Sequence, residues 1–161
     1  MPAQDSISVG IDLVSVSRME SILDRWGDRF LNRIFTRAEV DYCASRHSPA
    51  RSLAARFAAK EAFFKAVSGL SSARSEGASR AGSQGAGLDN GRILPRAPAG
   101  IRFTDVEVVI EPGGAPRLRS RGAAAEALGR SRASVSLSHE EDMAVAIVIT
   151  SPEIISPEVS G

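Results

Sequence analysis

The sequence has only one cysteine, Cys43, among its 161 residues. A single cysteine excludes an internal disulfide framework and a zinc site built from several cysteines. No stretch has the apolar length of a membrane span, and the first twelve residues lack the basic start and apolar run of a signal peptide. We therefore expect a cytoplasmic protein that has no membrane partner.

A strong net charge is also lacking. The 20 basic and 19 acidic residues leave a formal charge of +1, which predicts no nucleic-acid partner. Basic residues nevertheless gather in residues 46–65 and 117–132. Such clusters suit a phosphorylated small molecule or an acidic protein, and they also occur on ordinary solvated faces.

The common signatures of catalytic and binding sites are missing. There is no glycine-rich phosphate loop, no His-Glu-x-x-His zinc motif and no EF-hand loop. His47 and His139 are the only histidines, and neither lies in a recognisable order with a serine and an acid. Any chemistry must therefore depend on a few acids and cations.

The length and the apolar fraction of 43% predict one domain, residues 1–150, with its own core. Residues 71–91 consist mainly of Ser, Ala, Gly and Arg, and Leu88 is their only large aliphatic residue. Such a segment cannot bury enough apolar surface to offset its ordering entropy. We expect a flexible insertion at residues 71–99 and a loose tail at residues 151–161.

The order of elements predicts an α+β fold with a mainly antiparallel sheet. Residues 6–14 alternate as a half-buried strand, with Asp12 on the face opposite the apolar side chains. Capping boxes at Ser17 with Glu20 and at Thr36 with Glu39 begin two helices, of which the first ends at Gly27. A third helix covers residues 51–67. Then come a hairpin (101–110 and 117–119), a short helix (123–128) and two strands (133–138 and 143–150).

The third helix is the most secure, because strong helix formers fill it between Pro49 and Gly69. Lys60 lies on its apolar stripe, while Glu61 and Lys65 lie on one flank of that stripe and Arg56 on the other. Two interpretations stay open. The residues form the wall of a site, or Glu61 and Lys65 are an ordinary i,i+4 pair with snorkelling cations.

A sparse set of oxygen donors is compatible with the first interpretation. Asp12 near a strand end and Glu61 would suit Mg²⁺, which typically takes one or two protein carboxylates and leaves other positions to water and phosphates. Lys65 lies one turn from Glu61 and could meet the same phosphate, as could His139 at a strand end. Asp12 could equally terminate its strand, and His139 could be a turn residue before the acidic run 140–142.

Four blocks decide between these alternatives. They are Gly10-Ile-Asp12-Leu-Val-Ser-Val-Ser-Arg18, Phe35-Thr-Arg37-Ala-Glu39-Val, Ala55-Arg56-Phe-Ala-Ala-Lys60-Glu61-Ala-Phe-Phe-Lys65-Ala and Ser136-Leu-Ser138-His139. In this order, and with the Gly114-Ala-Pro116 turn, the chain closely resembles the holo-acyl-carrier-protein synthase group of 4′-phosphopantetheinyl transferases, of the small bacterial single-domain type. The resemblance covers nearly the whole chain apart from residues 71–99 and the tail.

The resemblance implies an enzyme of fatty-acid or polyketide synthesis. Such an enzyme transfers the 4′-phosphopantetheine arm of coenzyme A to a serine of apo acyl carrier protein and releases adenosine 3′,5′-bisphosphate. By matching position, Asp12 and Glu61 would hold Mg²⁺, and Asp12, Glu61 and Lys65 would be catalytic. The residues that would contact the coenzyme A phosphates are Arg56, Lys60, Lys65, Ser138 and His139.

The resemblance also implies a homotrimer with active sites at its subunit interfaces. Two other functions remain as alternatives: a non-catalytic module that binds the carrier, and a Mg²⁺-dependent nucleotide hydrolase. Loss of Asp12, Glu61 or Lys65 would favour the binding module, and all three residues are present.

Overall fold

The computed structural model describes residues 7–74 and 97–153. Its elements follow the predicted order of one strand, three helices and then antiparallel strands with one short helix, which confirms the α+β class. In chain order they are β1 (Ser8–Ser15), α1 (Val16–Ile34), α2 (Arg37–Ala44), α3 (Pro49–Arg74), the 3₁₀ turn η1 (Phe103–Asp105), β2 (Val106–Ile110), β3 (Pro116–Ser120), α4 (Gly122–Leu128), β4 (Ser131–Glu140) and β5 (Met143–Pro152).

Helix α3 and strand β5 both continue beyond their predicted C-terminal ends. Helix α3 includes residues 71–74, and β5 continues to Pro152. Most of the expected insertion, residues 75–96, and the last residues of the expected tail, 154–161, lie outside the described residues. Within the described ranges, no helix combines the length and the apolar character that a membrane crossing requires.

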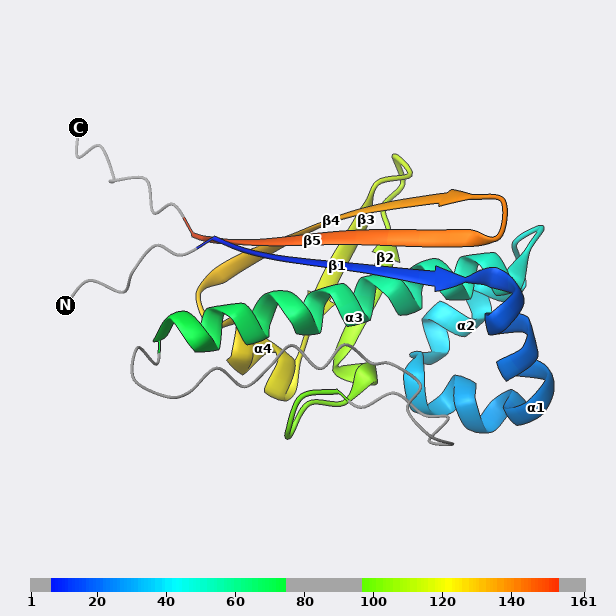
Figure 1. Ribbon diagram of the computed structural model, residues 1–161, viewed down its shortest axis with the longest axis horizontal. Helices are drawn as coiled ribbons and strands as arrows, with labels where there is room; N and C mark the ends of the chain where they lie inside the picture. Colours follow the sequence, from blue (N-terminus) through cyan, green and yellow to red (C-terminus); the bar gives the residue numbers. More distant parts are fainter. Residues whose placement is uncertain (1–6, 75–96, 154–161) are drawn as a thin grey trace.

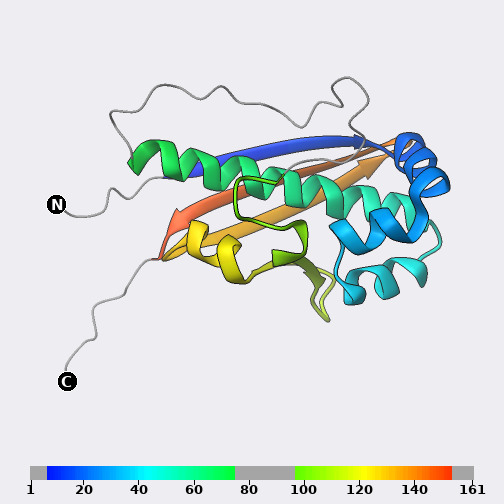
Figure 2. The ribbon, with the colours of Figure 1, turned by 90° about the horizontal axis from the view of Figure 1, so that it is seen from below.

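Three antiparallel strands, in the order β1-β5-β4, form the main sheet, and β2 pairs with β3 as a separate hairpin. Helix α3 runs along one face of the main sheet, with α1 and α2 at one end of the layer (Figure 1). The view from below shows α4 and the β2–β3 hairpin beside α3 (Figure 2). The core therefore lies between α3 and the sheet.

Close contact between β1 and α3 explains two glycines. A Cβ atom on Gly10 would lie 1.9 Å from the carbonyl oxygen of Ala62, so only glycine lets the strand approach the helix here. A Cβ atom on Gly69 would lie 2.2 Å from Ser8 Oγ. The prediction that the helix stops near Gly69 is wrong, because this glycine lets α3 pass β1 and continue.

Strand β1 alternates as predicted, but its polar side is the side that faces α3. The apolar side chains of β1 lie on the outer face of the sheet together with those of β5, and each is 39% to 68% exposed: Ile7, Val9, Ile11, Leu13, Met143, Ile147 and Ile149. Asp12 is on the inner face. The strand therefore delivers a carboxylate to the helix, not to solvent.

Helix α1 begins two residues before its predicted start. Its N-cap is Ser15, whose side chain accepts a hydrogen bond from Arg18 N, and not Ser17. The predicted end at Gly27 is a kink (φ 44°), after which the helix continues to Ile34. The capping box of α2, in which Thr36 and Glu39 bond each other's backbone N–H, is confirmed.

Candidate active site

Asp12 and Lys65 form an ion pair between β1 and α3. Lys65 Nζ lies 2.8 Å from Asp12 Oδ1 and 2.8 Å from the carbonyl oxygen of Ile11, to both of which it donates. The Lys65 side chain is 39% exposed and that of Asp12 is 18% exposed. Burial raises the pKa of Asp12, and Lys65 and Arg18 oppose that rise. The pair thus lies at the edge of the core, open to solvent on the lysine side.

Glu61 lies beside this pair, and the hydrogen-bonding capacity of its carboxylate is not fully used. The residue is 5% exposed, and its buried Oε1 accepts no hydrogen bond from residues 7–74 or 97–153. Burial and the negative charge of Asp12 raise the pKa of Glu61 to about 7, although Lys65 lowers it. A buried acid oxygen without a partner, next to a second carboxylate, is an arrangement that a cation would stabilise.

The donor set fits Mg²⁺ better than a transition metal. Asp12 and Glu61 supply only oxygen atoms, and the part of the chain that the structure describes contains no group of three or more His, Cys, Asp or Glu able to hold an ion. Mg²⁺ suits two carboxylates because water and substrate phosphates complete its octahedron.

Lys60 does not belong to this group. Its ammonium is fully buried and donates to Glu39 Oε2 at 2.7 Å, Ile34 O at 2.8 Å and Phe103 O at 3.0 Å. All three N–H groups of a lysine are thereby used. We therefore assign Lys60 to the core of the fold, where no phosphate reaches it.

Glu39 completes this buried node. Its Oε2 also accepts from Thr36 N at 2.8 Å, and its Oε1 accepts from Val108 N at 3.0 Å. The Glu39–Lys60 node therefore joins the end of α1, the start of α2, α3 and β2 through one carboxylate and one ammonium. Sequence reasoning found Glu39 only as a helix cap; an unpaired lysine on an apolar stripe was the signal that it needed an acidic partner.

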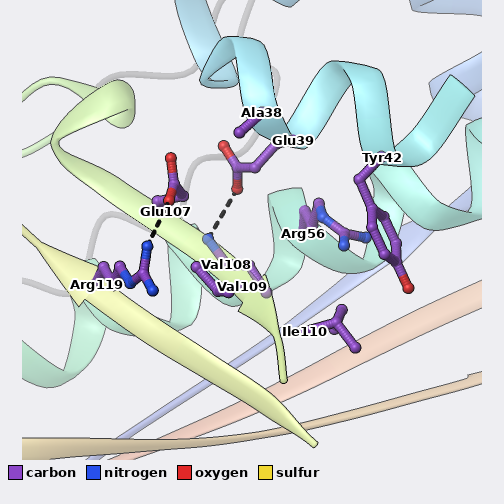
Figure 3. A pocket seen from close by; sticks show the side chains of 9 residues that line it. All are labelled: Ala38, Glu39, Tyr42, Arg56, Glu107, Val108, Val109, Ile110 and Arg119. Atoms are coloured by element: carbon purple, nitrogen blue, oxygen red, sulfur yellow. Dashed lines mark hydrogen bonds and ion pairs between the residues drawn. The ribbon is translucent and has the colours of Figure 1, made fainter. Parts of the chain in front are cut away.

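Arg56 lies in a separate pocket of about 230 Å³ between α2, α3 and the β2–β3 hairpin. Its guanidinium lies 4.3 Å from the centre of the Tyr42 ring, and Figure 3 shows the two side chains together at one side of the pocket. Arg56 is 4% exposed, and its Nε has no hydrogen-bond partner. The lining residues are Ala38, Glu39, Tyr42, Arg56, Glu107, Val108, Val109, Ile110 and Arg119.

The acids of this pocket are already paired. Glu39 is held by Lys60, and Glu107 lies 3.2 Å from Arg121 and 3.9 Å from Arg119. The buried Arg56 Nε is left as a donor without an acceptor. An anion in the pocket could therefore accept a hydrogen bond from Arg56. Neither Asp12 nor Lys65 lines this pocket.

Ser138 and His139 lie at the end of β4 and are both exposed. Ser138 pairs with Val145 on the outer face of the sheet, whereas His139 pairs with Ala144 on the inner side. Consecutive strand residues point to opposite faces, so one chain cannot direct both side chains at one phosphate through regular strand geometry.

Asp142, in the acidic run after His139, has a structural partner. Its carboxylate accepts hydrogen bonds from Ser17 N at 2.7 Å and from the Ser15 and Ser17 hydroxyls at 2.9 Å. These bonds, the backbone one first, lower the pKa of Asp142. The β4–β5 turn is thereby fastened to the start of α1, and this acid is not a free negative charge beside His139.

Known proteins resemble this chain over most of its length. Residues 8–148 match the family model of the 4′-phosphopantetheinyl transferase superfamily. The holo-[acyl-carrier-protein] synthase of Koribacter versatilis is 40% identical over 146 residues, which cover 89% of this chain and 96% of that protein.

Solved structures show the same relationship. The acyl carrier protein synthase of Mycobacterium tuberculosis is 34% identical with a TM-score of 0.62, and it covers 91% of this chain and 99% of its own. The Chronobacterium ammoniagenes ACPS–CoA complex is 26% identical with a TM-score of 0.68, covering 92% and 99% of the two chains. The chain belongs to the 4′-phosphopantetheinyl transferase superfamily, as its motifs predicted.

Proposed function

We propose that this protein transfers the 4′-phosphopantetheine group of coenzyme A to a serine of apo acyl carrier protein. The observation that carries the proposal is the meeting of Asp12, Glu61 and Lys65 at one edge of the core, with one Glu61 oxygen unpartnered. Similar proteins that are named for this activity, and solved complexes of such proteins with coenzyme A, support it.

The reaction requires that the two substrates are positioned and that the negative charge of the pyrophosphate is neutralised. The carrier serine oxygen bonds to the phosphorus of the phosphopantetheine group, and the bond from that phosphorus to the bridging pyrophosphate oxygen breaks. Glu61, directly or through a water, takes the serine proton as a general base. Lys65 stabilises the charge that develops on the departing adenosine 3′,5′-bisphosphate.

Asp12 and Glu61 are the residues that would hold Mg²⁺, which would neutralise charge on the pyrophosphate. Arg56 is our candidate for a further coenzyme A phosphate, because its buried Nε has no acceptor among the residues that the structure describes. Ser138 and His139 remain candidates for the same role from the exposed end of β4.

The exposed apolar face supports an assembly of several copies, and the resemblance to the family implies that the assembly is a homotrimer. The seven apolar side chains on the outer face of β1 and β5 form a patch of the kind that monomers rarely leave in water. Three candidate groups lie in different parts of one chain: Arg56, Ser138 and the Asp12–Lys65 pair. An active site shared between copies would bring them together. We place the assembly in the cytoplasm.

Sedimentation equilibrium tests the assembly. Ile11→Lys puts a charge into the centre of this face and should convert a trimer into monomers, whereas Arg37→Glu on the exposed surface of α2 should leave the mass unchanged. A monomeric wild-type protein would contradict the trimer.

The activity is tested by the mass of an apo carrier after incubation with coenzyme A, Mg²⁺ and the protein. We expect the carrier to gain one phosphopantetheine group with the wild-type protein and none with Asp12→Ala or Glu61→Ala, both of which should remain folded. Unmodified carrier that still binds the wild-type protein would indicate a binding module. Cleavage of coenzyme A without modification of the carrier would indicate a hydrolase.

A further inference from the structure

The ammonium of Lys65 already holds one of the two carboxylates that the proposed metal needs. Its Nζ lies 2.8 Å from Asp12 Oδ1, and the Ile11 carbonyl at the same distance keeps it there. Lys65 is thus the hydrogen-bonded counter-ion of Asp12 in the chain without ligands. Arg18 also acts on Asp12 through its charge, but no hydrogen bond joins the two.

The carboxylate of Glu61 has a different environment. Glu61 has a buried oxygen without a partner, and Lys65 contributes to it only through its charge. The two carboxylates of the proposed metal site therefore differ: Lys65 neutralises Asp12, whereas Glu61 has no ion-pair partner among the described residues. A metal ion that bridges both acids would bring its charge close to the ammonium, and the two like charges would repel each other.

The Lys65 side chain is able to move away from Asp12. It is 39% exposed, its flexible stem carries a compact charge, and its two acceptors lie on β1 alone. Lys60 on the same helix is the opposite case, because three acceptors on three different segments enclose its ammonium.

We infer that Lys65 exchanges partners during the reaction cycle: it neutralises Asp12 while the centre is empty and moves to the substrate phosphate when the metal and coenzyme A bind. This inference rests on the proposed function. It gives Lys65 two opposite effects, because the same ammonium competes with the metal in the free protein and assists the leaving phosphate in the loaded one.

Competition has a measurable sign. If metal binding must displace the ammonium from Asp12, Lys65→Met removes that step, and the free protein should bind a divalent cation more tightly. We expect a gain of up to about fivefold, as for one partly exposed ion pair that no longer has to be broken. The same variant should transfer phosphopantetheine more slowly than the wild-type protein.

Mn²⁺ serves as the probe, and its binding to the full chain without coenzyme A is measured by electron paramagnetic resonance. Asp12→Asn and Glu61→Gln locate the ion, Lys65→Arg keeps the charge and should keep wild-type affinity, and Arg18→Gln removes a nearby charge that makes no hydrogen bond to Asp12. Circular dichroism confirms that each variant is folded. Tighter binding in Lys65→Met than in Arg18→Gln, with weaker binding in the two acid variants, is the expected result.

Two results would overturn the inference, and they differ in what they leave standing. Unchanged or weaker Mn²⁺ binding in Lys65→Met, with weakened binding in Asp12→Asn and Glu61→Gln, removes the exchange but leaves the metal site of the proposed function. Binding that neither acid variant affects removes both the exchange and the proposed metal site.

Discussion

Helix α3 carries two lysine–carboxylate pairs that differ in almost every physical respect. Lys60 and Glu39 are both buried, and every polar atom of the two side-chain heads has a partner in the chain. Lys65 and Asp12 are partly exposed, and the acid next to them lacks a partner. The comparison teaches that a structural pair combines burial with full satisfaction of its hydrogen bonds, whereas a site that can bind a ligand keeps an unused acceptor and access to solvent.

The largest expected effect concerns the stability of the buried pair. Lys60→Ala leaves the Glu39 carboxylate charged and buried, so we expect the free energy of unfolding to fall by about 3–5 kcal/mol. Lys65→Ala, the matched control, should lower it by less than about 1 kcal/mol because its pair is partly exposed. Urea unfolding at pH 7 measures both values.

Equal losses in the two variants would contradict the division between a structural and a functional pair. A double variant, Lys60→Met with Glu39→Gln, removes both charges and should recover part of the stability that Lys60→Ala loses. No recovery would mean that packing, and not the unpaired charge, sets the effect at this node.

The next effect sharpens the chemical role of the exposed pair. Lys65→Arg keeps a positive charge near Asp12, but a planar guanidinium neither matches the compact ammonium nor gives up a proton readily. We expect kcat for phosphopantetheine transfer to fall about tenfold, which corresponds to about 1.4 kcal/mol. Steady-state kinetics with saturating carrier measure it; wild-type kcat would show that any nearby cation suffices.

The smallest effect concerns the pH dependence of stability in the absence of metal. Burial raises the pKa of Glu61 from 4.5 to about 7, so its ionisation opposes folding. Stability should therefore fall as the pH rises from about 4.5 to about 7, and the loss is complete above that range. Glu61→Gln removes this loss and should raise the Tm at pH 8 by at least about 2–4 °C, which is the shift expected for each 1 kcal/mol in a chain of this length.

At pH 4 the same substitution should leave the Tm nearly unchanged, because Glu61 is then protonated in both the folded and the unfolded chain. Differential scanning calorimetry at the two pH values decides the matter. An equal shift at both would show that Glu61 acts through packing and not through its charge.

Much of the fold followed from local patterns. Helix α3, the capping box of Thr36 and Glu39, and the β2–β3 hairpin depend on residues close in sequence, and all three were confirmed. Asp12 was predicted near a strand end and Lys65 on the flank of the apolar stripe of its helix, and the fold brings the two side chains together. Their assignment to catalysis remains a prediction.

Other features depended on distant partners. The inner face of β1 could not be chosen from alternation alone, because close packing at Gly10 outweighed the burial of four apolar side chains. Lys60 was expected near a phosphate, but the acceptors on Ile34 and Phe103 that enclose it are far away in sequence. The sequence showed Asp142 only as part of an acidic run. Its role at the start of α1, where it accepts a hydrogen bond from Ser17 N, depends on a residue far away in the sequence.

The most direct test of the account is the steady-state kinetics of Lys65→Ala. If Lys65 stabilises the leaving phosphate, its effect grows in the transition state, so kcat should fall by about 10²-fold or more while the KM for coenzyme A rises far less. The Tm should stay close to that of the wild-type protein. A wild-type kcat would contradict the catalytic role and leave Lys65 as a surface counter-ion of Asp12.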